Sequence, residues 1–218
     1  MPKQTFLNLS TEKQETFINA ALAEFAVNDF QKASISKIVK NLKIAKGSVY
    51  QYFENKKDLY LYLIEVAANK KRQYVMPLMQ RKFKDFWEQY EAMYLEGIRF
   101  DLENPLHSGF LYAISQERYS EELGNLMFEY RKQGLDVMKQ LIQPEWDAGR
   151  IRPDLSVDAI AYHLMQLSMG VMDMLAFKYN IDFRKNLEEH KPILALKKEE
   201  VMNSAREMLN IMKYGVLK

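Results

Sequence analysis

Positions 46–56, KGSVYQYFENK, carry side chains that suit contact with a nucleic acid. Lysine can reach guanine acceptors, and tyrosine and glutamine can touch base edges or thymine methyl groups. Val49 and Phe53 are four residues apart and can face a core, whereas Lys46 and Tyr50 share an outer side. One tyrosine here would more often pack between helices, but the whole set gives a short helix a polar outer face.

The basic residues are unevenly distributed along the chain. The formal net charge of the 218 residues is only +2. Residues 32–57, however, contain seven lysines and a single glutamate, a local net charge of +6. A cationic face on a near-neutral chain suggests a polyanionic partner. For charge alone, a solvated lysine face explains the pattern equally well.

Composition and periodicity indicate an all-α fold of about nine helices. The chain has only 8 glycines and 6 prolines, and few alternating runs of valine or threonine. Ser10 is a plausible cap for a first helix to about Val27, and Ser34 for a short second one. Asn55 and Asp58 resemble a capping box that opens a long fourth helix. Later helices are expected near residues 80–103, 106–117, 121–142, 156–179 and 197–215.

The helix order and the run AKGSVYQYFENKKDL resemble the DNA-binding domain of the tetracycline-repressor (TetR) family of bacterial transcription regulators. The strong resemblance covers roughly residues 11–71. It implies a helix-turn-helix DNA-binding domain over residues 1–71, with its motif at about 35–54. Residues 72–218 would then form a helical ligand-binding and dimerisation domain. The matching residues are Phe17, Ala21, Phe25, Ser34, Ile38, Ile44, Lys46, Gly47, Ser48, Tyr50, Tyr52, Phe53, Lys56 and Leu59.

This resemblance assigns DNA contacts to the second and third helices and to the start of the fourth. A recognition helix enters the major groove with its N-terminal residues against base edges, while other residues hold phosphates. The residues expected to contact a double-stranded operator are Ser34, Ser36, Lys37, Lys46, Gly47, Ser48, Tyr50, Gln51, Tyr52 and Lys56.

The sequence departs from the usual family pattern at three places. Lys43 stands where a glycine is usual, so we expect either a non-glycine residue in the left-handed backbone conformation or a slightly different turn. Ala45 replaces the usual serine or threonine cap of the recognition helix. Asp29 replaces another common glycine, and Asn28 could supply the unusual backbone angle instead.

The stretch 159–177 has one formal charge, Asp173, in 19 residues. Polar residues scattered through it argue against a membrane span and for a helix that is buried nearly all round. One side then needs a partner, most economically a second copy of the chain, although burial within one chain is the alternative. The expected dimer interface consists of Ile160, Leu164, Leu167, Val171, Met174, Val201, Ala205, Met208 and Met212.

The second half is also rich in aromatic residues between positions 83 and 130, which suits an apolar cavity. By the family resemblance, this cavity would hold an unidentified apolar or aromatic small-molecule effector. An ordinary helical core explains most of the same residues. Tyr94, Phe110 and Met169 are the candidate ligand contacts.

No catalytic, metal or cofactor signature accompanies these features. The chain has no cysteine, and its three histidines are far apart in the sequence. The N-terminus lacks an apolar run typical of a signal peptide, so a cytoplasmic protein is expected. We therefore expect a ligand-responsive regulator, a repressor that binds a palindromic operator as a dimer. The alternative is a helical small-molecule-binding or interaction protein without DNA binding, which salt dependence would distinguish.

Overall fold

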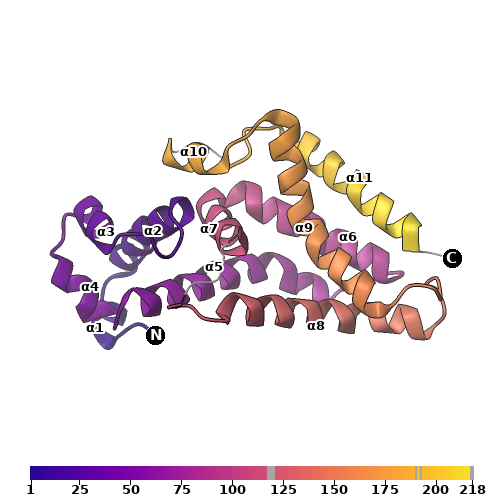
Figure 1. Cartoon of the computed structure of the whole chain (residues 1–218), viewed down its shortest axis with the longest axis horizontal. Helices are drawn as coiled ribbons and strands as arrows, with labels where there is room; N and C mark the ends of the chain where they lie inside the picture. The colour runs from indigo at the N-terminus through magenta and orange to yellow at the C-terminus, as the bar shows by residue number, and fades with distance from the viewer. Residues whose placement is uncertain (117–120, 190, 192, 217–218) are drawn as a thin grey trace. The chain divides into compact units, whose positions relative to one another are not determined.

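The computed structural model describes residues 1–116, 121–189, 191 and 193–216, which fold almost entirely as helices (Figure 1). This confirms the all-α class. The described residues form eleven helices and no strand, more helices than the nine expected. Helices α1 (Gln4–Leu7) and α10 (Phe183–Glu188) were not predicted, because four and six residues are too few for an apolar stripe to repeat.

The helices group into two compact units that do not follow a single cut in the sequence. Unit 1 contains residues 1–72, 104–124 and 183–193, and unit 2 contains residues 73–103, 125–182 and 194–218. The chain therefore passes repeatedly from one unit to the other.

Unit 1 contains the expected N-terminal helices together with two later segments. The bounds are α2 (Thr11–Val27), α3 (Ile35–Leu42), α4 (Lys46–Tyr52) and α7 (Pro105–Gln116), and α5 (Lys56–Met79) begins here. Its core includes Phe25, Tyr60 and Phe110, whose rings lie 5.1 to 6.4 Å from one another. Helices α7 and α10 both pack against α2.

Short-range capping signals place three helix starts correctly. The Ser10 side chain accepts a hydrogen bond from the amide of Lys13, and that of Ser156 from the amide of Ala159. At the start of α5, the Asp58 amide donates to Asn55 Oδ1 at 2.9 Å, and Asp58 Oδ2 accepts from the Glu54 amide at 3.1 Å. These bonds satisfy amides that a helix N-terminus leaves unpaired.

Unit 2 is built from α6 (Phe86–Glu103), α8 (Leu126–Asp147), α9 (Val157–Tyr179) and α11 (Lys198–Val216). Two buried tyrosines fix α6 to α9: Tyr90 donates to the carbonyl of Leu164 at 2.6 Å and Tyr94 to that of Leu167 at 3.0 Å. Burial raises the pKa of both hydroxyls, so they remain neutral donors.

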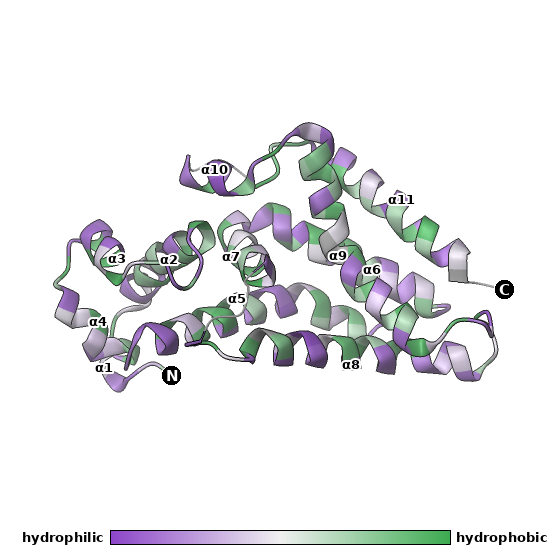
Figure 2. Ribbon diagram, viewed as in Figure 1, coloured by the Kyte–Doolittle hydropathy of each residue, from purple (hydrophilic) through white to green (hydrophobic). Residues whose placement is uncertain are grey.

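Hydrophilic residues interrupt the hydrophobic ones along the helices (Figure 2). Within the described ranges, no helix combines the length and the apolar character needed to cross a membrane.

His107 on α7 gives unit 1 an acid-sensitive position. Burial, with a smaller contribution from Lys70, lowers the pKa of His107 from 6.5 to about 4. Between these pH values the unfolded chain binds a proton that the folded chain does not, so stability decreases as pH falls from 6.5 to 4.

We expect the free energy of unfolding to fall by up to about 3 kcal/mol over this pH range because of His107. Urea denaturation at pH 7 and pH 4.5 measures the effect. The variant His107→Gln should lack this part of the pH dependence, and an unchanged dependence in that variant would contradict the assignment.

Candidate DNA-binding interface

Helix α4 is fixed on one side and free on the other. Val49 is 1% exposed and Phe53, directly after the helix, is 0% exposed, so both anchor it to unit 1 as predicted. Lys46 and Tyr50, one turn apart, are exposed on the outer side. Neither side chain makes a hydrogen bond or ion pair within the described part of the chain. They are therefore available to an outside partner.

Gly47 adds to this open face. A Cβ atom placed on Gly47 would meet no atom within 4 Å, so the packing of the chain itself does not require a glycine there. Gln51, one turn further, is exposed as well. The absence of a side chain at position 47 leaves room for a partner to approach the backbone of α4 closely.

The turn between α3 and α4 is built around Lys43. This residue has φ 55° and ψ 37°, the left-handed conformation that was one of the two outcomes expected from the missing glycine. The next amide, that of Ile44, donates to the carbonyl of Val39 at 3.1 Å. Ala45 provides no side-chain cap for α4, also as expected. In contrast, the suggestion for Asn28 is wrong, because its backbone is extended with φ −110°.

Two of the residues expected to hold phosphates at α3, Ser34 and Lys37, lie beside Glu24. Ser36 is exposed, and Ser34 is half-buried with its amide donating to Glu24 Oε1 at 2.9 Å. Ser34 precedes α3 but makes no side-chain capping bond, contrary to expectation. The Lys37 ammonium lies 4.0 Å from the same carboxylate, with 63% of its side chain exposed. Such a long, exposed pair holds the lysine only weakly.

Tyr52 and Lys56 are more engaged with the fold than the sequence indicated. The Tyr52 ring makes edge contacts with the rings of Phe6 and Phe17 at 5.7 and 5.6 Å. The Lys56 ammonium donates to the carbonyl of Gln31 at 3.3 Å and lies 4.6 Å from the centre of the Phe30 ring. Both residues thus contribute to packing. Ser48, one turn before Tyr52 on α4, is half-buried.

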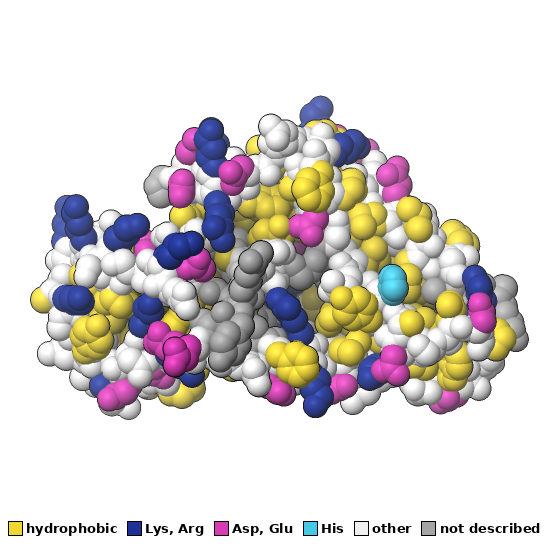
Figure 3. Space-filling model, in the orientation of Figure 1, with side chains coloured by type: hydrophobic (Ala, Val, Ile, Leu, Met, Phe, Trp, Pro, Cys, Tyr) yellow, Lys and Arg dark blue, Asp and Glu magenta, His cyan; other side chains and the backbone are white. Residues whose placement is uncertain are grey.

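All ten residues expected at the DNA interface belong to unit 1. Lysine side chains gather over α3 and α4 on the face shown in Figure 3. Sequence reasoning did not assign Lys40 and Lys43, which are exposed at the end of α3 and in the turn. Their place in the lysine-rich run 32–57 was the available signal.

Known proteins share both the motif and the whole fold. Residues 17–63 match the model of bacterial regulatory proteins of the tetR family. The fatty acid metabolism regulator protein of Bacillus subtilis is 35% identical over 147 residues, which are 66% of this chain and 74% of that protein. The chain belongs to the TetR family. As a member of this family it is a DNA-binding transcriptional regulator and not an enzyme.

Solved structures agree with this membership. The crystal structure of a TetR family transcriptional regulator from Chloroflexus aurantiacus is similar with a TM-score of 0.80 and 28% identity, over 100% of this TetR-family chain and 99% of that one. FadR from Bacillus subtilis, solved in complex with stearoyl-CoA, is similar with a TM-score of 0.62 and 18% identity, over 91% and 96% of the two chains. The second likeness shows the shared fold.

In this TetR-family chain, most residues expected at a dimer interface are buried within unit 2. Exposure is 9% or less at the following six positions: Ile160, Leu164, Leu167, Val171, Val201 and Ala205. Met174, Met208 and Met212 are half-buried. The six buried residues therefore pack inside the chain, and different residues of α9 and α11 face outward.

The candidate effector contacts are divided between the two units. Phe110 is 0% exposed within the aromatic core of unit 1. Tyr94 belongs to unit 2, where its hydroxyl is bound to the Leu167 carbonyl. Met169 lies on α9, but its side chain is outside the described part of the structure.

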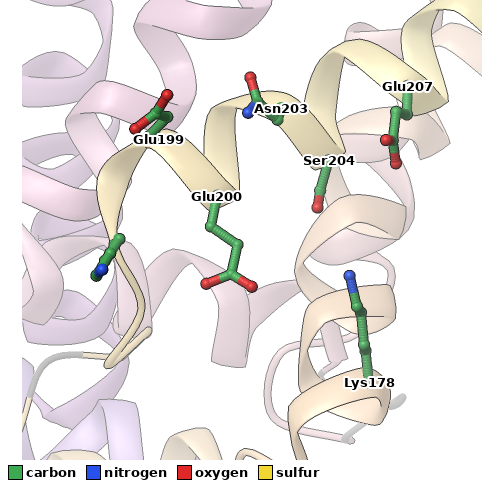
Figure 4. A pocket seen from close by; sticks show the side chains of 7 residues that line it. Lys178, Glu199, Glu200, Asn203, Ser204 and Glu207 are labelled. Atoms are coloured by element: carbon green, nitrogen blue, oxygen red, sulfur yellow. The ribbon is translucent and has the colours of Figure 1, made fainter.

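A surface hollow beside α9 and α11 does not suit an apolar effector. It has a volume of about 350 Å³ and is lined by Lys178, Lys197, Glu199, Glu200, Asn203, Ser204 and Glu207. Figure 4 shows Glu200 and Ser204 pointing from α11 toward this hollow and Lys178 pointing into it from α9. Charged groups line it, so it resembles a solvated depression rather than an apolar cavity. The described residues also contain no cluster of side chains that could hold a metal ion.

Proposed function

We propose that this regulator is a repressor that binds a palindromic operator as a homodimer, with one α4 helix of each subunit in the major groove. The exposed, unpaired face of α4 supports this most directly, because its inward side is anchored while Lys46 and Tyr50 are free. Two such helices must reach successive major grooves, about 34–36 Å apart along the duplex. Acting on genomic DNA would place the protein in the cytoplasm.

The residues of this face divide into two roles. Lys46 is positioned to reach guanine acceptors, Tyr50 and Gln51 to reach base edges or thymine methyls, and Gly47 to admit the DNA closely. Phosphate contacts fix position without reading sequence. We assign those to Ser34, Ser36, Lys37, Ser48, Tyr52 and Lys56, with Tyr52 and Lys56 also serving the packing described above.

We propose that the homodimer forms through the outward faces of α9 and α11. Phe177 is 85% exposed on α9, and Ile211 and Tyr214 are 77% and 71% exposed on α11. Figure 3 shows hydrophobic side chains gathered over these helices. A set of large apolar side chains in water is typical of a surface that a partner covers. The six buried residues of the same helices would support this face from inside.

Replacing Phe177 with glutamate is expected to raise the dissociation constant of the dimer at least about tenfold, because a charge would replace a large apolar contact. Sedimentation velocity over a range of concentrations measures it. Val137 on α8 is 49% exposed and provides the control Val137→Glu, which should leave the dimer unchanged. Equal dimerisation of Phe177→Glu and the wild-type chain would argue against this interface.

The effector we propose is a long-chain acyl thioester, a more specific form of the apolar effector expected from the sequence. The Bacillus subtilis relative is named for fatty acid metabolism, and a FadR structure contains stearoyl-CoA. Tyr94, Phe110 and Met169 remain candidate contacts. Such an effector would release DNA if it bound better to the subunit arrangement that fits the operator poorly.

Binding of labelled duplexes selected by the protein tests both parts of the proposal. Affinity should fall steeply with added salt, as counterion release requires, and stearoyl-CoA should weaken binding more than coenzyme A or stearate alone. If the chain bound stearoyl-CoA but no duplex, the alternative function would be supported instead, namely a helical small-molecule-binding protein without DNA binding. If acyl-CoA compounds left duplex binding unchanged, the proposed effector class would be wrong.

A further inference from the structure

The C-terminal end of the recognition helix depends on a segment more than 40 residues earlier in the chain. Helix α4 has only seven residues, and an isolated helix of that length is unstable in water. A helix leaves its last four carbonyl groups without intrahelical donors. In α4, the carbonyl of Val49 receives the amide of Phe53 at 2.8 Å. The carbonyls of Tyr50, Gln51 and Tyr52 need donors from elsewhere.

Residues 3 and 5 supply all three donors. The Lys3 amide donates to the carbonyl of Tyr52 at 2.7 Å, and the Lys3 ammonium donates to that of Tyr50 at 3.0 Å. The Thr5 hydroxyl donates to the carbonyl of Gln51. The positive charge of Lys3 at this end also interacts favourably with the negative end of the helix dipole. Each of the three carbonyls thus receives one donor, so residues 3 and 5 act as a C-terminal cap that comes from outside the helix.

The donor segment is itself held firmly in unit 1. Phe6 on α1 is 0% exposed, and its ring contacts the rings of Phe17, Tyr52, Phe53 and Tyr62 at 5.1 to 5.7 Å. The side-chain amide of Gln14 donates to the carbonyls of Leu7 and Leu9 at 3.2 and 2.9 Å. Residues 3–9 are therefore fixed to α2 and α5 through the buried Phe6 side chain, and they connect both helices to α4.

Lys3 is not arranged as an additional phosphate contact. Its ammonium is shared between the Tyr50 carbonyl and Glu54 Oε2, at 3.0 and 2.9 Å. We propose that residues 3–9 are a positioning segment for the recognition helix, in which Lys3 and Thr5 fix the backbone that carries Tyr50 and Gln51. Small displacements of a recognition surface weaken specific contacts more than non-specific ones, since only specific contacts need exact geometry.

The variant Thr5→Val tests this inference, which rests on the proposed DNA-reading role of α4. It removes one hydroxyl donor at nearly constant shape and charge. Affinity for a duplex selected by the wild-type chain should fall about fivefold, with an unchanged salt slope and unchanged affinity for a scrambled duplex. Thr5→Ser should restore wild-type binding. The control Gln4→Ala should have no effect, because the Gln4 side chain donates to Asn8 Oδ1 within the same segment, at 2.8 Å, and not to α4.

Lys3→Met distinguishes positioning from direct phosphate binding. A positioning residue predicts weaker binding to the selected duplex and an unchanged dependence on the logarithm of salt concentration. A slope reduced by about one, with equal loss on the scrambled duplex, would show a phosphate contact and overturn the inference. Wild-type binding by Thr5→Val would overturn it as well.

Hydrogen exchange tests the positioning role independently of the proposed function, because the measurement needs no DNA. Amides of residues 50–53 should exchange faster in Thr5→Val than in the wild-type chain without any DNA, while peptides from α7 remain unchanged. Unchanged exchange at 50–53 would contradict the positioning role. A wild-type chain that binds no duplex would contradict the proposed function instead.

Discussion

A chain in which Lys46 and Tyr50 are both replaced by alanine is expected to bind its selected duplex about 100- to 1,000-fold more weakly than the wild type. Each side chain that reads a base edge contributes about 1–3 kcal/mol, and a tenfold change corresponds to about 1.4 kcal/mol. The two side chains lie one turn apart on the exposed side of α4 and make no hydrogen bond or ion pair with another described residue. Their loss should therefore leave the fold intact.

Fluorescence anisotropy with a labelled duplex measures this loss, and circular dichroism with urea denaturation checks the fold. Lys82→Ala removes one exposed lysine from unit 2 and serves as the charge-matched control. This control should bind within about twofold of the wild type, as exposed sites remote from a contact usually do. Normal operator binding by the Lys46→Ala, Tyr50→Ala chain would show that α4 does not read DNA.

The second large effect concerns Phe53, which anchors α4 from inside. This side chain is 0% exposed, and its ring lies 5.1, 5.8 and 5.4 Å from the rings of Phe6, Phe17 and Tyr62. Phe53→Ala would leave a cavity among α1, α2 and α5 in unit 1. We expect the free energy of unfolding to fall by about 3–5 kcal/mol, and DNA binding to be lost because unit 1 unfolds.

Urea denaturation followed by circular dichroism separates this outcome from the loss of a DNA contact. Phe53→Leu, which fills more of the cavity, should cost much less and should retain duplex binding at low temperature. If Phe53→Ala kept wild-type stability but lost DNA binding, the residue would belong to the interface and not to the core.

The parts of the fold that sequence predicted best are those set by local signals. The caps at Ser10, Asn55 and Ser156 depend on bonds to amides within three residues, so residue type and spacing suffice. The left-handed conformation of Lys43 was one of the two outcomes expected from its position in the turn. The inward pair Val49 and Phe53 followed from helical spacing.

Long-range contacts were not predictable in the same way. Helix α1 is too short to show a period, and the donors of Lys3 and Thr5 meet carbonyls 46 to 49 residues away. The assignment of residues 104–124 and 183–193 to unit 1 likewise depends on packing against α2. No local pattern in those segments indicates which helix they will contact.

The apolar stretch 159–177 shows another limit of sequence reasoning. Periodicity indicated burial, but it could not distinguish a partner helix of the same chain from one of a second copy. Leu164 and Val171 are buried within unit 2, whereas Phe177 on the same helix is 85% exposed. Only the packed structure separates the inward residues from the outward ones.

Selection of duplexes from a random library, followed by measurement of protein stoichiometry on the enriched sequence, tests the central claim most directly. The account predicts an inverted repeat with half-sites about one helical turn, or a multiple of it, apart, occupied by two chains and released as salt rises. Enrichment of no sequence at low salt, or occupancy of the best duplex by a single chain, would contradict it.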